Sequence, residues 1–376
     1  MQKIPLMVPW FGEAEIEAIS EVIRSGWIAQ GPVVKQFEQA FKERVGSAEA
    51  VAVANCTAGL HLALIVAGIQ PGDEVIVPSF SFIATTNSVI HAGAVPVFAD
   101  IAIETGNLTA ASIASAVTDR TRAVMVVDQA GVPADLDEIF AYCRPRGLMV
   151  IEDAACAIGS TYKSKPIGSH SDLVVFSFHP RKILTTGEGG MIATNNSDWA
   201  ARIRRLREHG MSLSAADRHH MGATSIETYP ETGFNYRMTD IQAALGLVQL
   251  DKLDQLISRR RELAERYEKQ IGDIGGLHPV VDPPYGTSNY QSYWVRLDDS
   301  VLKSRNKVME ELESLGVSTR RGIMTAHREL ACSKYFREPL PISEHLSDNS
   351  LILPLYHTMS YAEQDHVIES ITQVVQ

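Results

Sequence analysis

Lys182 is the residue in this sequence whose setting most favours covalent chemistry. It lies between two apolar, β-branched runs, Leu173–Phe176 and Met191–Thr194, which are typical of buried strands. The residues between Lys182 and the second run are rich in glycine and threonine, so we predict a tight turn there. A lysine on such a turn can be partly desolvated, which lowers its pKa and makes its amine nucleophilic towards carbonyl groups. Because an isolated loop lysine is more often simply solvated, this interpretation depends on the other residues.

A carboxylate and an anion-binding turn are predicted near the same edge of a sheet. Asp153 follows the strand-like run Leu148–Glu152, where a ligand of a parallel sheet binds, and it could hold a protonated ring nitrogen. The turn Asn55–Ala58 offers backbone N–H groups and the Thr57 hydroxyl at a helix N-terminus, which favours a phosphate. Each feature has an ordinary alternative, because aspartate and asparagine commonly cap turns and helices.

Phe82 supplies a fourth feature, because a flat ring placed after the next strand could stack on a planar cofactor. Taken alone, Phe82 is more simply explained as a core residue. In combination, the four features suit one planar, phosphorylated ligand that has a ring nitrogen and a carbonyl group. Pyridoxal 5′-phosphate (PLP) meets all four requirements, so we predict a PLP site. No metal site is predicted.

The composition restricts the class of protein and its surroundings. At 376 residues, of which 45% are hydrophobic, the chain is long enough for two domains. The formal net charge of −11 argues against a general nucleic-acid binder. Four scattered cysteines without metal-site or disulfide spacing suit a reducing compartment, so we expect a cytoplasmic protein. Neither a secretory signal nor a membrane span is predicted.

The elements that must position these residues alternate along the first half of the chain. After two helices, Trp10–Ser25 and Val34–Val45, short apolar runs predict strands that alternate with helices. The predicted strands are Ala50–Ala54, Glu74–Val77, Val95–Asp100, Ala123–Val127 and Leu148–Glu152, and the predicted helices are Ala58–Ala67, Ile83–Ala92 and Leu136–Arg144. Repeated βαβ units predict an α/β protein with a mostly parallel sheet covered by helices.

The second half of the chain has a different pattern. A capping box formed by Thr239 and Gln242 predicts the start of a long helix that ends near Gln270. Glycine and proline clusters follow, and three later runs predict a smaller α+β domain, namely Tyr293–Leu297, Lys303–Ser314 and Ser360–Val375. We therefore predict a large domain over residues 1–250 and a small domain over residues 251–376. The N-terminal segment could pack on the small domain.

The sequence resembles the DegT/DnrJ/EryC1/StrS aminotransferases, which are sugar aminotransferases of the aspartate aminotransferase fold type. Several independent segments carry the resemblance, in order and over nearly the whole chain: PGDEVIVPSFSFIAT, GVPADLDEI, IEDAACAIGS, FSFHPRKILTTGEGGM, GFNYRMTDIQAALG and LILPLYHTMS. The resemblance implies fold type I, with a three-layer α/β domain, a mostly parallel mixed sheet and a smaller C-terminal α+β domain.

The resemblance also implies roles for individual residues. Lys182 matches the lysine that binds the cofactor as a Schiff base and then carries the proton between cofactor and substrate carbons. Asp153 matches the carboxylate that keeps the pyridinium nitrogen protonated, and Phe82 matches the ring that stacks on the pyridine. Thr57 and Ser177 match hydroxyl groups that bind the cofactor phosphate.

Asn235 matches a residue that reaches the cofactor phosphate of the neighbouring subunit, so the resemblance implies a homodimer with shared active sites. Two cysteines depart from the usual pattern of the family near the cofactor. Cys56 stands where glycine is common, and backbone donation still works there. Cys156 stands where glutamine or histidine is common, and both thiol chemistry and simple packing are open at this position.

Substrate contacts are predicted around the lysine and in two later segments. Arg181 stands where a small polar residue is usual, and it could bind a carboxylate or phosphate or face solvent. His179 could assist proton transfer or be structural. The remaining candidates are Arg237, Arg320 and the segments Glu208–Tyr229 and Thr319–Arg328, which could instead be exposed polar loops.

The resemblance predicts a transamination in two halves. L-glutamate or L-glutamine first gives its amino group to the cofactor, leaving pyridoxamine phosphate, which then aminates a keto-sugar. The acceptor is expected to be a nucleotide-linked 4-keto or 3-keto hexose, and the amino sugar would serve polysaccharide or natural-product biosynthesis.

Three other functions compete with this prediction. In a PLP-dependent sugar dehydratase of the same family histidine replaces the lysine, so Lys182 counts against that activity. A non-catalytic ligand-sensing regulator is a second alternative, although the chain retains both Lys182 and Asp153. A nucleotide-binding oxidoreductase is disfavoured because no GxGxxG follows the first strand.

Overall fold

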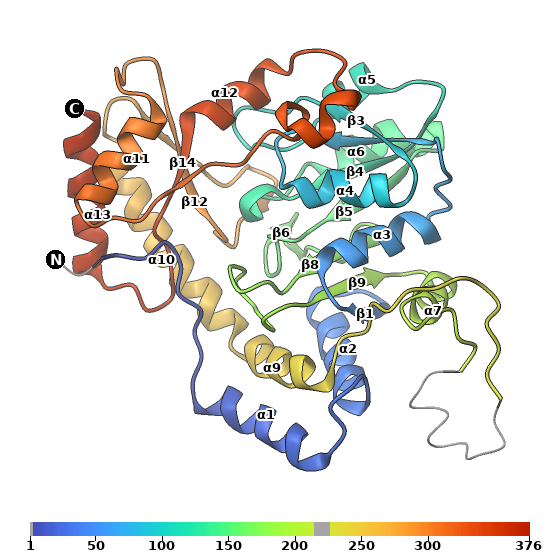
Figure 1. Cartoon of the computed structure of the whole chain (residues 1–376). Helices are drawn as coiled ribbons and strands as arrows, with labels where there is room; N and C mark the ends of the chain where they lie inside the picture. The colour runs from blue at the N-terminus through green and yellow to red at the C-terminus, as the bar shows by residue number, and fades with distance from the viewer. Residues whose placement is uncertain (1–2, 214–225) are drawn as a thin grey trace.

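The computed structural model describes residues 3–213 and 226–376 (Figure 1). The chain forms a larger α/β unit and a smaller α+β unit, and both the first described residues and the C-terminus lie beside the smaller unit. Within the described ranges, no helix is long and apolar enough to cross a membrane.

A seven-stranded sheet forms the centre of the larger unit. In spatial order its strands are β1 (Glu49–Val53), β9 (Gly190–Thr194), β8 (Leu173–Ser177), β5 (Met149–Asp153), β4 (Thr121–Val127), β2 (Glu74–Pro78) and β3 (Val95–Ala99). Strands β8, β5, β4, β2 and β3 are mutually parallel, whereas β9 runs antiparallel to both β1 and β8. Each predicted strand is present with ends that differ by at most two residues, and the prediction of a mostly parallel mixed sheet is confirmed.

Helices cover both faces of this sheet and complete a three-layer arrangement. One layer contains α2 (Pro32–Val45), α5 (Ala110–Ala116), α6 (Leu136–Cys143) and α9 (Asp240–Asp251), and the other contains α3 (Cys56–Val66), α4 (Ile83–His91) and α7 (Ser197–Leu206). Successive residues of a strand point to opposite faces, so each strand contributes to both layers. In β8, for example, Val174 and Phe176 join one apolar cluster and Val175 joins the other.

The smaller unit is built on an antiparallel sheet with the order β10-β12-β14-β13. Its strands are β10 (Leu277–Pro279), β12 (Tyr293–Leu297), β14 (Ser350–Leu353) and β13 (Arg320–Arg321), and its helices are α10 (Leu253–Ile271), α11 (Arg305–Ser314) and α13 (Tyr361–Val375). The N-terminal segment belongs to this unit, because Ile4 lies in its apolar cluster and bridges Val317. The domain boundary between residues 250 and 251 stays a prediction.

The remaining elements lie outside the two sheets and the helices that cover them. They are α1 (Glu13–Ser25), which packs on α9; α12 (Pro341–Asn349); a small sheet of β6 (Thr161–Tyr162), β7 (Lys165–Pro166) and β11 (Gly286–Thr287); and the 3-10 helices η1 (Gln129–Gly131), η2 (Arg144–Arg146), η3 (Ala326–Arg328) and η4 (Leu330–Tyr335). Helices α5, α7 and α12 were not predicted, although Thr109 caps α5 and Asn196 caps α7 with their side chains.

The predicted long helix after Thr239 is only partly correct. The capping box is present, because Thr239 Oγ1 accepts the Gln242 N–H (3.2 Å) and Gln242 Oε1 accepts the Thr239 N–H (2.9 Å). A single helix to Gln270 is wrong, since Lys252 (φ −84°, ψ −7°) separates α9 from α10. The Lys252 ammonium pairs with the buried carboxylate of Glu15 (2.5 Å). The break redirects the chain, because α9 packs on α1 and α2 whereas α10 packs on α13 and β10.

A pair of acidic side chains is buried within the central sheet. Asp128 follows β4 and Glu152 lies in β5, and both are fully buried. Burial raises the pKa of both carboxyl groups, and the negative charge of Glu152 raises the pKa of Asp128 further. Neither carboxyl oxygen of Glu152 has a hydrogen-bond partner at normal distance and angle among the described residues, although the nearby polar groups of Ser171 and Asp128 oppose the rise of its pKa. Ionisation of these two carboxyl groups therefore lowers the free energy of unfolding of the protein.

We expect Glu152→Gln to stabilise the protein at pH 8 by about 1 kcal/mol, because the amide removes a buried charge. The pKa of this carboxyl group is higher in the folded protein than in the unfolded chain, where it is about 4. The group therefore lowers the free energy of unfolding progressively as the pH rises from the unfolded pKa to the folded pKa. The gain should therefore vanish near pH 4 and grow towards pH 8. Denaturant unfolding across this range measures it, with the exposed Glu310→Gln as the matched control. Equal destabilisation by Glu152→Gln at every pH would contradict the prediction.

Candidate active site

A cavity of about 740 Å³ lies where the carboxyl ends of the parallel strands face the smaller sheet. Asp153 ends β5 and Ser177 ends β8, and both residues line the cavity. Across from them, Trp294 of β12, Arg320 of β13 and Leu353 of β14 also line it. This position is the one at which open parallel sheets bind ligands.

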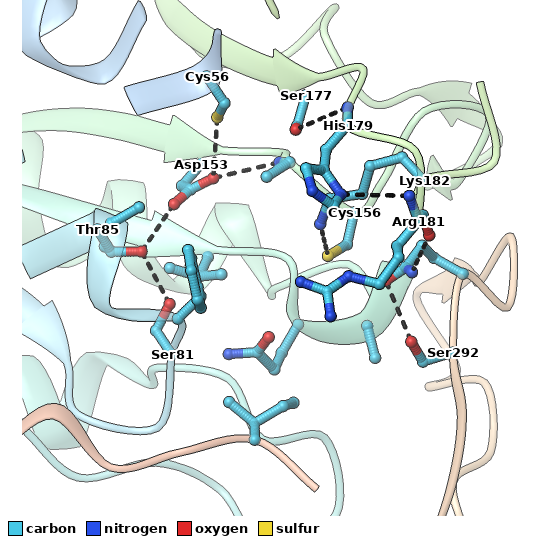
Figure 2. Close-up of a pocket in the computed structure, with 18 of the residues that line it drawn as sticks. Cys56, Ser81, Thr85, Asp153, Cys156, Ser177, His179, Arg181, Lys182 and Ser292 are labelled. Atoms are coloured by element: carbon cyan, nitrogen blue, oxygen red, sulfur yellow. Dashed lines mark hydrogen bonds between the residues drawn. The ribbon is translucent and has the colours of Figure 1, made fainter. Parts of the chain in front are cut away.

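Lys182 projects into this cavity from the turn between β8 and β9 (Figure 2). The Lys182 N–H donates to the His179 carbonyl (2.8 Å), which closes the turn, and Nζ donates to Cys156 Sγ (2.9 Å). Burial of the amine lowers its pKa, but the neighbouring sulfurs of Cys156 and Cys56 and the Asp153 carboxylate raise it, and the net direction is upward. The expected lowering of the Lys182 pKa is thus wrong, because desolvation is outweighed by these neighbours.

Asp153 lies at the floor of the cavity and is 4% exposed. Its carboxylate accepts hydrogen bonds from the Thr85 hydroxyl (2.8 Å) and the Ala155 N–H (3.2 Å), and the Cys56 sulfur lies 4.0 Å away (Figure 2). Burial raises the Asp153 pKa, and these hydrogen bonds oppose the rise. No described residue forms an ion pair with Asp153. A buried carboxylate of this kind suits a ligand that brings its own positive charge, such as a protonated ring nitrogen.

The predicted phosphate turn is formed at the N-terminus of α3. The Asn55 side chain caps the helix by accepting the Ala58 N–H (2.9 Å), and Cys56 and Thr57 follow it on the cavity wall. Strand β9 approaches this turn closely, because a side chain at Gly190 would place its Cβ 2.8 Å from the Cys56 nitrogen. Unpaired N–H groups and the helix dipole at such a terminus favour an anion.

Phe82 is 63% exposed and lines the cavity as the N-cap residue of α4. The alternative that it is an ordinary core residue is therefore wrong. Its turn is connected to the cavity floor, because Ser81 bonds to Thr85 (2.8 Å) and Thr85 bonds to Asp153. An exposed ring held at this position can cover one face of a planar ligand.

The structure brings most of the predicted site residues together. Those that line the cavity are Cys56, Thr57, Phe82, Asp153, Cys156, Ser177, His179, Arg181, Lys182 and Arg320. Asn235 and Arg237 are not part of the lining; Asn235 is exposed and forms a strand bridge with Glu208. In the predicted segment Thr319–Arg328, residues 320–324 line the cavity, whereas most of Glu208–Tyr229 (residues 214–225) lies outside the described residues.

Several cavity residues were missed in the sequence. Thr85 could have been found, because it lies one helical turn after Phe82 at the start of a helix that follows a strand. Arg260 could not, because nothing in a run of three arginines marks the middle one as buried. It is 3% exposed, and its guanidinium donates to the carbonyls of Tyr290, Gln291 and Leu355 at 2.8–3.0 Å.

Comparisons with known proteins identify the family of the chain. The sequence model of the DegT/DnrJ/EryC1/StrS aminotransferase family matches residues 9–372. The chain is 39% identical to the spore coat polysaccharide biosynthesis protein SpsC of Bacillus subtilis (strain 168) over 99% of this chain and 97% of SpsC. The fold is also shared over almost the whole chain with solved structures, of which two are described next.

The first of these structures is Spr1654 from Streptococcus pneumoniae in its PMP-form, with a TM-score of 0.93, 29% identity and 99% of each chain covered. The second is the sugar aminotransferase CalS13 from Micromonospora echinospora, with a TM-score of 0.89, 28% identity, and 98% of this chain and 99% of CalS13 covered.

The fold and the site define a PLP-dependent enzyme of fold type I, in which a lysine, a buried carboxylate and an anion-binding helix terminus share one cavity. The chain belongs to the DegT/DnrJ/EryC1/StrS aminotransferase family. It is therefore a PLP-dependent aminotransferase of the sugar-aminotransferase type.

Replacing Asp153 with asparagine should reduce kcat about 100-fold or more at saturating PLP, because the ring nitrogen loses its anionic partner. Asparagine has nearly the same shape and can still accept the Thr85 hydrogen bond, so folding should be preserved. Steady-state kinetics and PLP titration of the purified variant measure both effects. Thr85→Val, which removes only a supporting hydrogen bond, serves as the matched control and should cost less. An Asp153→Asn enzyme with parental kcat would contradict the role of the charge.

Proposed function

We propose that the protein transfers an amino group from L-glutamate or L-glutamine to a keto-sugar, a nucleotide-linked 4-keto or 3-keto hexose, in polysaccharide or natural-product biosynthesis. The observation that carries this proposal is one cavity that holds Lys182, Asp153 and a group of arginines. The names of two relatives support a sugar acceptor, since SpsC is a polysaccharide biosynthesis protein and CalS13 is a sugar aminotransferase.

The residues of the chain divide the catalytic work between them. Lys182 Nζ is the only lysine amine that lines the cavity in the described structure, so we assign it the movement of protons at the reacting carbon. Asp153 holds the proton on the cofactor ring, while the α3 turn with Thr57, together with the Ser177 hydroxyl, holds the phosphate. When bound, PLP supplies the electron sink and carries the amino group between donor and acceptor.

Cys156 is the residue in contact with the catalytic amine. Its sulfur accepts the hydrogen bond from Lys182 Nζ, and it is half-buried at the cavity wall. This contact favours a direct role near the cofactor over packing alone, which were the two alternatives left by the sequence. His179 is less directly placed, because its Nδ1 accepts the Arg181 N–H (3.2 Å) and so stabilises the turn.

The cavity lining has more basic than acidic side chains and so suits an anionic substrate. Four arginines line it, whereas the acidic residues that line it are Asp153 and Glu188. The lining arginines are Arg181, Arg260, Arg320 and Arg321. Arginine binds carboxylates and phosphates through paired hydrogen bonds, so Arg181, Arg320 and Arg321 favour both the α-carboxylate of an amino-acid donor and the diphosphate of a nucleotide sugar. The Arg260 guanidinium is buried and already donates to three backbone carbonyls.

The alternative activities lack comparable support. The dehydratases of the family replace the lysine, whereas Lys182 here contacts the cavity. A ligand-sensing regulator would have no need for a lysine and a buried carboxylate in the same cavity. An oxidoreductase is opposed by the family membership of the chain.

A homodimer with shared active sites forms part of the proposal. Large apolar side chains are exposed on and near α1, namely Phe11, Ile16, Ile23 and Ile28, with exposures between 49% and 58%. An exposed apolar surface of this kind is typical of an interface between subunits. Asn235 is exposed outside the cavity of its own chain, which suits a residue that serves the partner's site.

The decisive experiment follows the visible absorption of the purified protein with PLP before and after L-glutamate. We expect a band that L-glutamate bleaches in the parent, whereas Lys182→Ala should form no normal band and should turn over at least about 100-fold more slowly. L-glutamine and L-aspartate serve as parallel donors. A normal band that no amino donor bleaches would end the transaminase proposal, and release of 2-oxoglutarate identifies glutamate as the donor.

Arg181 allows a test of anion recognition beside the catalytic lysine. Its backbone is fixed, since the N–H bonds to His179 and the carbonyl accepts from Gln291 (3.1 Å), while no described residue pairs with its guanidinium. We expect Arg181→Gln to raise the half-saturating concentration of one substrate about 10-fold, and Arg181→Lys to restore part of it.

Separate half-reactions with L-glutamate and with a nucleotide-linked keto-sugar show which substrate Arg181 serves. The matched control is Arg146→Gln, because Arg146 stacks on Tyr142 outside the cavity. Parental half-saturation for both substrates would rule out a role of Arg181 in binding.

A further inference from the structure

A chain of hydrogen bonds next to the active site connects three residues that are distant in sequence. Ser79 Oγ lies 2.5 Å from His327 Nδ1, and His327 Nε2 lies 3.1 Å from Glu344 Oε1. Ser79 directly follows β2, His327 lies in η3 and Glu344 lies in α12. Ser79 is fully buried and His327 is 4% exposed. The three residues therefore join the central sheet to two later segments of the chain.

Two contacts join His327 to Ser79. The backbone N–H of His327 donates to Ser79 Oγ (3.2 Å), and the same oxygen hydrogen-bonds to Nδ1 of the ring. The other ring nitrogen, Nε2, hydrogen-bonds to Glu344. The imidazole is also held between the rings of Phe98 and Phe336, with centroid distances of 6.2 and 5.7 Å. Two hydrogen bonds and two aromatic neighbours therefore fix the orientation of the imidazole ring.

A serine, a histidine and a carboxylate in this order can serve as a nucleophilic triad, but this set cannot attack a substrate. A nucleophile must be accessible to its substrate, whereas Ser79 is fully buried. None of Ser79, His327 and Glu344 lines the cavity. Any effect of these three residues on the active site must therefore act through the position of the chain segments that they connect.

The two segments joined by these residues lead to two separate parts of the cavity lining. Next to the Ser79–His327 contact, the Ala326 N–H donates to the Ser79 carbonyl (2.8 Å), and Phe80 bridges Thr325 as in an antiparallel strand pair. On one side the chain continues through Ser81 to Phe82 on the cavity wall. On the other side it leads back from Thr325 to residues 320–324, which line the same cavity.

We propose that His327 is a positioning residue, which fixes the separation between Phe82 and the wall formed by residues 320–324. This inference builds on the proposed function, in which the cofactor and the substrates bind between these walls. Small displacements of binding groups weaken productive binding strongly, even when the residue responsible does not touch the ligand. His327 thereby sets the affinity of the site and leaves the chemistry to Lys182.

Two substitutions separate the two hydrogen bonds of His327. In His327→Asn the amide can replace Nδ1 and keep the bond to Ser79, whereas in His327→Gln the longer side chain can reach Glu344 and lose Ser79. Ser79→Ala removes the ring contact from the other side, together with the hydrogen bond that Ser79 Oγ accepts from the His327 backbone N–H. Dissociation constants for pyridoxamine 5′-phosphate are measured by calorimetry, and the L-glutamate half-reaction is followed by absorption.

We expect His327→Gln and Ser79→Ala to raise the dissociation constant and the half-saturating glutamate concentration about 10-fold, with the limiting rate within about 3-fold of the parent. His327→Asn should stay within about 3-fold of the parent for both quantities, because it retains the bond between the two walls. The control is His366→Gln, since His366 bonds to the Leu315 carbonyl and does not line the cavity. It should leave both quantities unchanged.

Lower melting temperatures with parental binding constants in both His327→Gln and Ser79→Ala would show a merely structural role and overturn the proposal. Equal loss of binding in His327→Asn and His327→Gln would overturn the assignment of the effect to the Ser79 contact. The proposed function fails separately, if the parent binds pyridoxamine 5′-phosphate but no amino donor reacts. The binding constants still test His327 in that case.

Discussion

The register between β5 and β8 is the constraint on which the active site depends. These two parallel strands pair with Asp153 opposite Val175, so the chain leaves both strands at the same edge of the sheet. There Asp153 and the turn that carries Lys182 meet. Because side chains alternate along a strand, a slip of one residue would exchange Asp153 for the neighbouring Glu152. The apolar residues of both strands, buried on both faces, hold the register that selects the correct carboxylate.

The same constraint shows why two adjacent acidic residues have opposite consequences. Asp153 points to the cavity, where hydrogen bonds and a cationic ligand can compensate its charge. Glu152 points to the opposite face of the sheet, beside Asp128, and its carboxyl oxygens lack hydrogen-bond partners at normal geometry among the residues described. One position supports function and the other reduces stability. The sheet tolerates the second because the parallel core around it is large and apolar.

Most of the fold and the floor of the site could be predicted from the sequence, because both depend on local patterns. Strands buried on two faces appear as short apolar runs, and residues that follow parallel strands gather at one edge. Lys182, Asp153, Thr57 and Phe82 were predicted in this way and lie around one cavity.

Features that depend on long-range packing could not be predicted. Lys252 breaks a helix pattern that is continuous in sequence, because Glu15 and the change of packing partner lie far away along the chain. The direction of the Lys182 pKa also depends on distant neighbours, since Cys156 and Cys56 reach the amine only in the folded chain. His327 gave no signal as a lone histidine, although it joins two walls of the cavity.

The division of the cavity between the two units has a consequence for specificity. The floor is built from the ends of β5 and β8 and from the start of α3, which all belong to one closely packed sheet and its covering helix. The opposite wall comes from residues 320–324, which are connected to the large sheet through the Ser79–His327 contact and the bridge beside it. A rigid floor can hold one cofactor in a fixed position while a separately held wall varies with the substrate. Differences in substrate between relatives should therefore concentrate in the wall and not in the floor.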